Sequence, residues 1–172
     1  MPPQKKLLSY RYATIIFDLT SDFLRTFLPE IDHRRTREQM TQAARSGKQN
    51  IVEGAGRDLT SMKSEITLLD VARTSFEELT EDYEDFLRQK GLKIWSKTDP
   101  RVEKIRQRSF SLTRLDNLDS EGQFKTNPHL SSNPEQAANV LLTLCHQASY
   151  LVYKQIKISK TKLSLRAVTL KT

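Results

Sequence analysis

The sequence is poor in the residues that form tight turns and covalent crosslinks. Five glycines and six prolines among 172 residues leave little room for the many turns of a β-rich fold, so we expect mostly helix. Cys145 is the only cysteine, which excludes an internal disulfide and disfavours a cysteine-based metal site. Its apolar neighbourhood on a predicted helix indicates inert packing in the core rather than a reactive thiol.

Long apolar segments are also missing. No apolar run approaches the roughly 20 residues that a membrane-spanning helix needs. The Pro-Pro-Gln-Lys-Lys segment at the start is not followed by the apolar region of a signal peptide. We therefore expect a cytoplasmic protein that has no membrane partner.

The sequence shows none of the motifs that carry enzyme chemistry. His33, His129 and His146 lack metal-ligand spacing, and we expect His146 to be a core or boundary residue. The Gly54-Ala55-Gly56 segment has neither the preceding strand nor the third glycine of a dinucleotide-binding loop. There is no phosphate loop, nucleophile elbow or supported cysteine-histidine pair. We expect a protein without enzymatic activity, cofactor or metal.

Acidic residues are outnumbered by basic ones, and the two kinds are unevenly distributed. The net charge is +7, yet residues 58–90 contain 9 acidic against 4 basic residues. Residues 134–172 show the opposite bias, with 6 basic residues and one acidic residue. An acidic third segment in an otherwise basic chain favours binding to a polyanion.

Apolar residues recur at spacings of three and four in four long segments, which indicates amphipathic helices. The first predicted helix covers residues 10–28 and ends at Pro29. The second covers residues 34–56, with Asp32 or a Thr36–Gln39 capping box at its start and glycines 54 and 56 at its end. The third covers residues 60–90 and ends before Gly91. Its apolar positions are Leu69, Ala72, Phe76, Leu79, Tyr83 and Phe86.

The region after Gly91 is less regular. Asp99 followed by Pro100 predicts a short helix that reaches about Leu112, and residues 116–133 are typical of a polar loop. The last long helix opens at Asn133, with Pro134 in its first turn, and we expect it to end near Ile156. The remaining tail, which has four lysines, one arginine and no acidic residue, is either flexible or ordered by a partner.

These patterns predict an all-α protein, an up-and-down four-helix bundle with a helical insertion between helices three and four. We assign residues 1–157 to the bundle, residues of about 91–133 to the insertion, and residues 158–172 to a basic C-terminal tail.

Small residues gather on one side of the predicted helix at residues 34–56. Ala43, Gly47, Asn50 and Gly54 fall within about 100° of arc on a helical wheel, together with Met40 and Ile51. Glycine inside a helix costs roughly 1 kcal/mol relative to alanine, so we expect close packing of a neighbouring helix to offset this at Gly47. A buried Asn50 amide requires hydrogen-bond partners, which we expect on a backbone carbonyl or on the first or third helix.

Basic residues occupy the opposite side of the same predicted helix. Arg34, Arg37, Arg45 and Lys48 project within about 80° of one another. Such a row neutralises phosphates without reading bases, and its binding depends on salt. The alternative is a solvated helix face on which Glu38 partly neutralises Arg34.

The sequence resembles a known bacterial family in several segments. They are the run from Asn50 to Arg57 (NIVEGAGR), the positions Glu65, Leu69, Ala72, Arg73, Ser75 and Glu77–Leu79, the RSGKQN stretch at 45–50, and ANVLLTL at 138–144. With these segments the chain resembles the four-helix-bundle proteins encoded in intervening sequences of large-subunit ribosomal RNA genes. It is most similar to their subgroup with a four-helix-bundle suffix domain, which has an added segment after the third helix.

This resemblance implies an up-and-down four-helix bundle that assembles into a homopentameric ring. Relatives include the accessory variability determinant of diversity-generating retroelements, a basic pentamer that binds a reverse transcriptase and nucleic acid. The implied partners are thus further copies of this chain, nucleic acid with RNA favoured, and a reverse transcriptase. The resemblance implies no active-site residue.

A ring offers a role for the acidic third helix. A head-to-tail interface joins two different surfaces, so an acidic face of one subunit can meet a basic patch of the next. The predicted interface residues are Glu77, Glu78, Glu81, Asp82, Glu84 and Asp85. The alternative is a solvated acidic helix face.

Two functional hypotheses follow. In the first, the protein is a non-enzymatic, oligomeric scaffold that binds RNA or DNA through phosphates. The contacts would come from the basic row at residues 34–48 and from Lys154, Lys157, Lys160, Lys162 and Arg166. In the second, it is a protein-interaction adaptor, for example the accessory subunit of a reverse transcriptase, with the tail and the insertion around Trp95 as docking elements.

Overall fold

The computed structural model describes residues 1–55 and 61–171. The helices are η1 (Pro3–Lys6), α1 (Leu8–Phe27), α2 (Glu30–Ala55), α3 (Met62–Gln89), α4 (Pro100–Leu112), η3 (Leu115–Asn117) and α5 (Pro134–Thr169). Within these described ranges there is no strand, and one isolated β-bridge joins Leu118 to Phe124. The predicted all-α class is confirmed.

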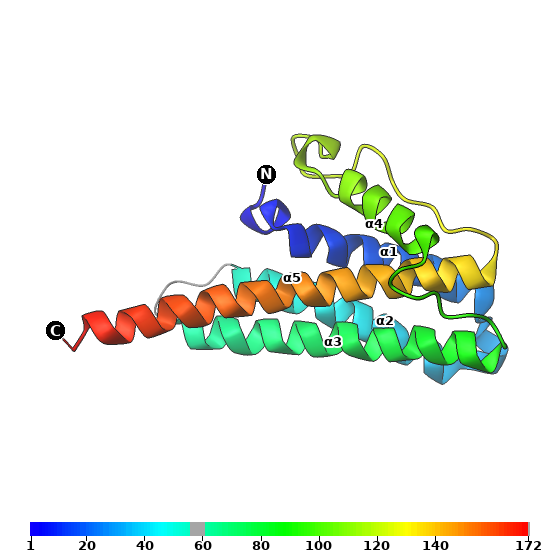
Figure 1. Ribbon diagram of the computed structural model, residues 1–172, viewed down its shortest axis with the longest axis horizontal. Coiled ribbons are helices and arrows are strands. Elements are labelled where there is room, and N and C mark those ends of the chain that lie inside the picture. Colours follow the sequence, from blue (N-terminus) through cyan, green and yellow to red (C-terminus); the bar gives the residue numbers. More distant parts are fainter. Residues whose placement is uncertain (56–60, 172) are drawn as a thin grey trace.

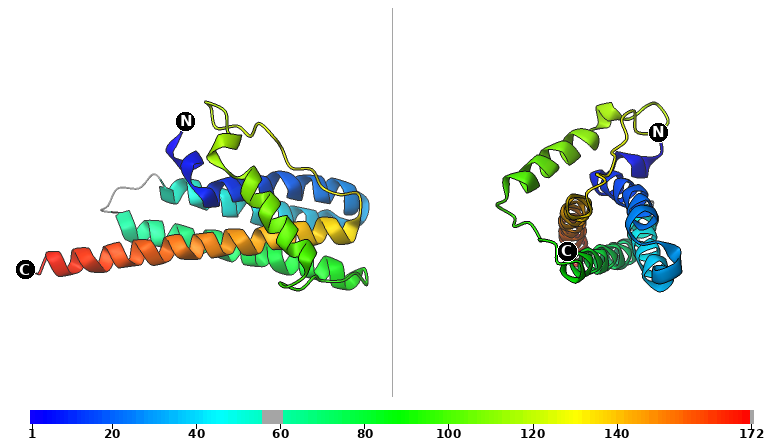
Figure 2. Two further views of the ribbon diagram at one scale, coloured as in Figure 1. Left: turned by 45° about the horizontal axis from the view of Figure 1, so that its top comes forward. Right: turned by 90° about the vertical axis from the view of Figure 1, so that its right-hand side faces the viewer.

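The four longest helices contact one another in a closed cycle. α1 packs on α2, α2 on α3, α3 on α5, and α5 on α1. Figure 1 shows the chain running back and forth along the long axis of the molecule through these helices. α4 lies outside this group and packs on α5, as the two views of Figure 2 show. The segment between α3 and α5 therefore adds a helix to one side of the molecule.

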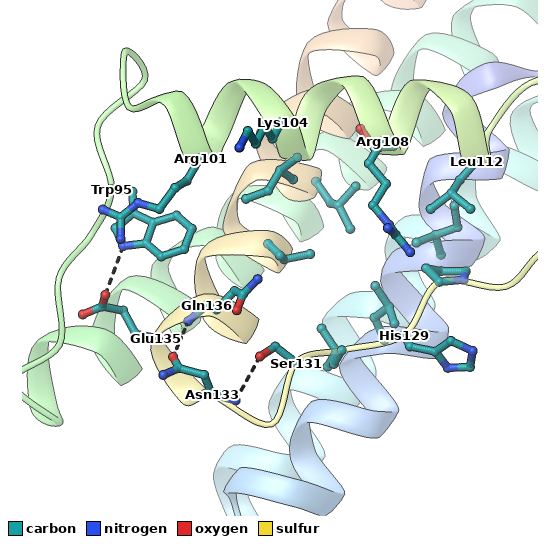
Figure 3. A pocket seen from close by; sticks show the side chains of 18 residues that line it. Trp95, Arg101, Lys104, Arg108, Leu112, His129, Ser131, Asn133, Glu135 and Gln136 are labelled. Atoms are coloured by element: carbon teal, nitrogen blue, oxygen red, sulfur yellow. Dashed lines mark hydrogen bonds between the residues drawn. The ribbon is translucent and has the colours of Figure 1, made fainter.

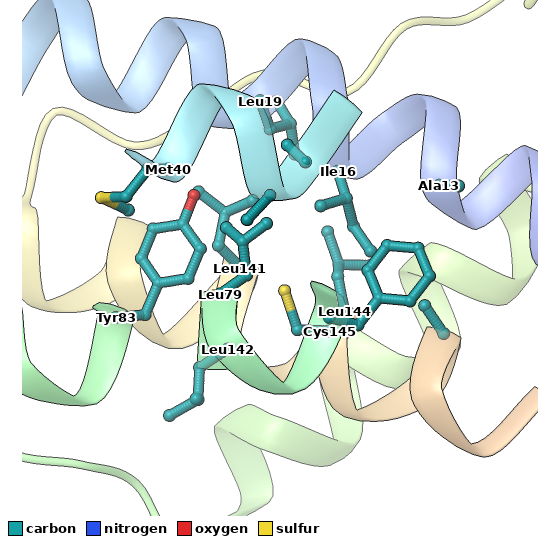
Figure 4. Close-up of a cluster of buried hydrophobic side chains, with 14 of the residues drawn as sticks. Ala13, Ile16, Leu19, Met40, Leu79, Tyr83, Leu141, Leu142, Leu144 and Cys145 are labelled. Carbon is teal, nitrogen blue, oxygen red and sulfur yellow. The ribbon is translucent and has the colours of Figure 1, made fainter. Parts of the chain in front are cut away.

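The core lies between the four long helices and is built by the predicted apolar positions. All six predicted apolar residues of α3, from Leu69 to Phe86, are buried. Figure 4 shows Tyr83 and Leu79 of this helix in one cluster with Cys145 of α5. Burial raises the pKa of the Cys145 thiol. The thiol therefore packs as an apolar group, as predicted. The Thr20 and Tyr83 hydroxyls hydrogen-bond across the core at 2.7 Å.

Three of the predicted helix boundaries are confirmed by their cap geometry. The Asp99 carboxylate accepts a hydrogen bond from the Arg101 backbone N–H at 2.9 Å and caps α4. The Asn133 side chain accepts one from the Gln136 N–H at 2.9 Å and caps α5. Gly91 follows α3 with a φ of +66°, the left-handed conformation that favours glycine.

The predicted start near Arg34 coincides with a kink inside α2 and not with the first residue of the helix. The helix begins at Glu30 and has a kink at His33, where φ is −134° and ψ is 21°. Thr36 therefore lies inside the helix, so the Thr36–Gln39 pair is not a capping box. The kink explains why the helical pattern begins near Arg34 in the sequence. The predicted stop at Gly56 and the predicted start of α3 at Thr60 lie outside the described residues.

The predicted end of the last helix near Ile156 is wrong, because α5 continues to Thr169. Residues 157–169 contain neither glycine nor proline, so nothing in this segment breaks the helix. Its first turns still pack on α3: Ser159 is buried, and its hydroxyl donates a hydrogen bond to the Glu65 carboxylate at 3.0 Å. The helix then projects beyond the ends of its neighbours (Figure 1). The basic segment 158–169 is thus a helical extension without a break at 157.

Candidate nucleic-acid interface

The small-residue face of α2 allows α3 to approach closely. Ala43, Gly47 and Gly54 are buried. A Cβ atom built on Gly47 would lie 2.7 Å from Cε1 and 2.8 Å from Cζ of Phe76, so the ring occupies the space that a side chain would need. At Gly54 the nearest atom is 3.7 Å away, on Leu69. The expected packing role of Gly47 is therefore found against Phe76.

Asn50 is half-buried and bonds within its own helix. Its amide donates hydrogen bonds to the Ser46 carbonyl at 2.9 Å and to the Ser46 hydroxyl at 3.2 Å. A backbone carbonyl was one of the two expected partners. No hydrogen bond from Asn50 to the first or third helix is found among the described residues. Ser46 supplies the link to the third helix, because its hydroxyl accepts a hydrogen bond from Ser75 of α3 at 3.0 Å.

Arg37 is half-buried and links α2 to the end of α1. Its Nη1 donates hydrogen bonds to the carbonyls of Leu24 and Leu28, each at 2.6 Å. These carbonyls lie at the C-terminal end of α1, where that of Leu24 also accepts the Leu28 backbone N–H at 3.1 Å. The guanidinium therefore stabilises the connection between α1 and α2, and its Nη1 is committed to these carbonyls.

The remaining residues of the basic row on α2 differ in their surroundings. Lys48 is half-buried, and its Nζ lies 5.8 Å and 5.2 Å from the ring centroids of Tyr10 and Phe17 on α1. Arg34 is exposed but paired with Glu38 at 3.1 Å. Arg45 is exposed, and no salt bridge to it is found within the described ranges. Three of the four cations in the predicted row therefore already have partners. Arg37 and Lys48 contact α1, and Arg34 pairs with Glu38.

A second group of cations lies on α5, directly after two tyrosines on the same side of the helix. Tyr150, Tyr153, Lys154, Lys157 and Lys160 fall within about 120° of arc, and we call this group the Lys–Tyr face. All five side chains are exposed, Tyr150 to 60%.

The cations of the Lys–Tyr face lie close to its rings. Lys154 Nζ lies 5.6 Å from the Tyr150 ring centroid, and Lys157 Nζ lies 5.6 Å from that of Tyr153. Arg73 of α3 approaches Tyr153 from the neighbouring helix at 5.2 Å. The face therefore offers positive charge and aromatic surface at the same place.

The other two predicted cations of α5 point in a different direction. Lys162 and Arg166 lie about 80° and 120° from Lys154 around the helix, on the side away from the Lys–Tyr face. Both are exposed and belong to the projecting part of the helix. They surround the extension with positive charge and do not continue the Lys–Tyr face. Sequence reasoning found these cations and missed the tyrosines, although their position next to Lys154 and Lys157 was visible.

The predicted acidic interface forms a continuous face on α3. Glu77, Glu78, Glu81 and Asp85 are exposed, while Asp82 and Glu84 are half-buried. Glu77 pairs with Arg73 at 3.1 Å and Asp85 with Arg88 at 2.9 Å. Burial, followed by the charges of Asp85, Glu78 and Glu81, raises the pKa of Asp82 to about 6. The Asp82 side chain lines a groove between α2 and α3 that also contains Glu38.

Trp95 is fixed to the start of α5 and is not an exposed docking residue. The indole N–H donates to the Glu135 carboxylate at 3.1 Å, and the Arg101 guanidinium lies 3.9 Å from the ring centroid. The buried Asn139 side chain accepts from the Trp95 backbone N–H and donates to the Lys93 carbonyl, both at 2.9 Å. The segment that carries Trp95 is therefore held to α5 by polar contacts that periodicity does not reveal.

Residues 1–55 and 61–171 contain neither a candidate membrane span nor a candidate metal cluster. No helix in these ranges combines the length and the apolar character required to cross a bilayer. No group of three or more histidine, cysteine, aspartate or glutamate side chains in them is arranged to hold a metal ion. In comparisons with known proteins, no family model, no curated protein and no solved structure matches the chain.

Proposed function

We propose that the protein is a non-enzymatic, homo-oligomeric scaffold that binds single-stranded nucleic acid, with RNA favoured. The fold underlying this proposal is an up-and-down four-helix bundle with a helical insertion, which presents α5 as its basic edge. The observation that carries the proposal is the Lys–Tyr face, in which two exposed tyrosines and the three lysines that follow them lie on one side of one helix.

The chemistry of this face suits a single strand. Lysine ammonium groups neutralise backbone phosphates, while tyrosine rings offer surfaces on which unpaired bases stack. Stacking tolerates any base, so we expect little sequence preference. Because α5 is a continuous helix, the lysines keep a fixed spacing along the strand.

The charge around the face supports the same ligand. After Glu135 the sequence contains no acidic residue, so Lys154, Lys157 and Lys160 have no acidic neighbour in this part of α5. Within the described part of the chain, no salt bridge involves Lys154, Lys157, Lys160 or Lys162. The exposed Arg45 on α2 is a secondary contact, whereas Arg37 and Lys48 are engaged with α1.

Oligomerisation would multiply these contacts. We propose that the acidic face of α3, at Glu77, Glu78, Glu81, Asp82 and Asp85, meets a basic surface of the next subunit in a closed ring, with a pentamer as the expected size. A ring places several copies of the Lys–Tyr face on one assembly, and avidity then strengthens individually weak contacts. The mass in solution tests this. Glu78→Lys combined with Glu81→Lys should reduce a pentamer to smaller species, and a wild-type monomer at all concentrations would contradict it.

The nucleic-acid site is tested with two variants of equal charge. One replaces Lys154, Lys157 and Lys160 by glutamine, and the other replaces Arg34, Arg35 and Arg45 by glutamine. Binding of a fluorescent single-stranded RNA should weaken at least about tenfold in the first variant and much less in the second.

Equal losses in the two variants would mean that only net charge matters and would contradict the proposed site. RNA binding that is unchanged in the first variant would remove the Lys–Tyr face as a nucleic-acid interface and favour an acidic protein partner instead. A pull-down with added nuclease then identifies the adaptor function, because protein partners survive that treatment.

A further inference from the structure

A pocket of about 660 Å³ lies between α4, the first turns of α5, and α1. Its volume is in the range of roughly 300–1,000 Å³ that is common for small-molecule sites. Much of its lining is aliphatic, and these side chains belong to α1, α4, α5 and the loop before α5. The aliphatic lining consists of Ile15, Leu19, Ile105, Leu112, Leu130, Val140 and Leu144.

One wall of the pocket is held in place by charged and polar contacts. Asp99 binds Arg101 through two hydrogen bonds of 3.0 Å and 2.8 Å, and Arg101 in turn stacks on Trp95. Glu135 accepts hydrogen bonds from the Lys93 backbone N–H at 2.8 Å and from Trp95, and these donors lower the pKa of its carboxyl. The only carboxylate of the pocket lining is therefore occupied by its own partners.

Two cations of the rim have no such partner. Lys104 and Arg108 line the pocket from α4, and in the described part of the chain neither forms a salt bridge or a side-chain hydrogen bond. Figure 3 shows Arg108 extending from α4 toward the loop that carries His129. A guanidinium binds a carboxylate through two parallel hydrogen bonds, and an aliphatic surface beside it accepts a hydrocarbon chain.

We propose that this pocket binds a medium-chain fatty acid. The alkyl chain lies on the aliphatic lining between α1, α4 and α5, and the carboxylate binds Arg108, which extends from α4 toward the loop of His129 (Figure 3). Burial of the chain supplies affinity in proportion to the apolar area removed from water, and the Arg108 guanidinium fixes the orientation of the ligand.

The lining favours an alkyl chain over a nucleotide. Apart from the His129 imidazole, Trp95 is the aromatic ring of the pocket, and its N–H and one ring face are already used by Glu135 and Arg101. A nucleobase needs stacking surface and polar partners for its edge, whereas the floor offers methyl groups.

The test is a calorimetric titration of the full chain with dodecanoate, below its micelle concentration, alongside dodecanol and AMP. Dodecanoate should bind with a 1:1 stoichiometry per chain, dodecanol about tenfold more weakly, and AMP more weakly still. Arg108→Gln should weaken dodecanoate about tenfold and leave dodecanol unchanged, since only the charged contact is lost. The control Arg35→Gln removes an equal charge from α2 and should change neither.

Val140→Phe tests the floor of the pocket independently, because the larger ring fills the space of the chain and should block both alkyl ligands. The helical circular dichroism of each variant shows whether it is folded. The proposal would be overturned if the wild type showed no saturable binding of dodecanoate, or if it bound AMP as tightly as dodecanoate. It would also be overturned if the folded Arg108→Gln and Val140→Phe variants both bound dodecanoate with the wild-type affinity. Replacing Lys154, Lys157 and Lys160 by glutamine should leave dodecanoate binding intact, which distinguishes this site from the nucleic-acid interface.

Discussion

Phe76 of α3 packs against Gly47 of α2 so closely that a Cβ atom on the glycine would lie 2.7 Å from the ring. Phe76 is fully buried, so the ring has no free space into which it can move. The two helices therefore approach each other at a point where one supplies a large ring and the other supplies no side chain. This contact explains why a helix of this length contains glycine near its middle.

Gly47→Ala should destabilise the protein, although alanine is the better helix former. The added methyl group forces Phe76 or the helix backbone to shift, and overpacking of this kind typically costs about 1–3 kcal/mol. Gly54→Ala is the matched control, because its new methyl group would lie 3.7 Å from Leu69 and make ordinary contact. Chemical denaturation measures both free energies of unfolding. A Gly47→Ala variant that is as stable as Gly54→Ala would contradict the packing.

Arg37→Gln should reduce stability far more than it reduces RNA affinity. The substitution leaves the carbonyls of Leu24 and Leu28 without their charged donor, and such a loss costs about 1–3 kcal/mol. Arg34→Gln is the comparison, since it removes only an exposed ion pair with Glu38 and should change stability little. If the Arg37→Gln variant were instead as stable as wild type and bound RNA weakly, Arg37 would be an RNA-binding residue, and its structural role at the end of α1 would be contradicted.

Asp82→Asn should stabilise the protein at neutral pH. Because the folded-state pKa of Asp82 is about 6, above the ordinary value of 3.8, the folded protein binds the proton more tightly than the unfolded chain. The stability from protonated Asp82 is fully present below about pH 4 and lost as the pH rises through 6. After allowance for solvent screening of this half-buried group, we expect a gain of about 1–2 kcal/mol at pH 7.

Denaturation of the Asp82→Asn variant from pH 4 to pH 8 measures this effect. The difference from wild type should vanish near pH 4 and level off above pH 7. Glu81→Gln, an exposed neighbour on the same helix, serves as the control. A constant difference at every pH would show that the effect does not come from titration of Asp82.

Asn139→Leu should release the segment that carries Trp95. The substitution removes the hydrogen bonds to the Trp95 N–H and to the carbonyls of Lys93 and Glu135, with an expected loss of about 2–3 kcal/mol. Trp95 is the only tryptophan, so its emission reports directly on the segment and should shift to longer wavelength. Asn127→Leu is the control in an exposed part of the loop before α5. An unchanged spectrum in the Asn139 variant would contradict the contact.

The long helices and their caps could be predicted from the sequence because their signals are local. Spacings of three and four identified the buried positions of α3, and the Asp99-Pro100 and Asn133-Pro134 pairs located the starts of α4 and α5. The end of α5 could not be predicted from its basic composition. The lysines of residues 157–171 suggested a flexible tail. Residues 157–169, however, contain no glycine or proline, so the helix that is already formed before them can continue.

The candidate site was less accessible to sequence reasoning because its surroundings depend on distant segments. A helical wheel grouped Arg37 and Lys48 with Arg45, but the end of α1 brings carbonyl acceptors to Arg37, and the first half of α1 brings aromatic rings to Lys48. Likewise, Arg73 reaches Tyr153 only because α3 and α5 are neighbours in space. Periodicity gives the direction of a side chain and does not give its partners.

The most direct test of the proposed function is the salt dependence of RNA binding. Each phosphate of a single strand that is neutralised by a cation contributes about −0.7 to the slope of log association constant against log salt. Replacing Lys154, Lys157 and Lys160 by glutamine should therefore make the wild-type slope less negative by about 2. The same slope in wild type and variant would show that these lysines do not contact phosphate.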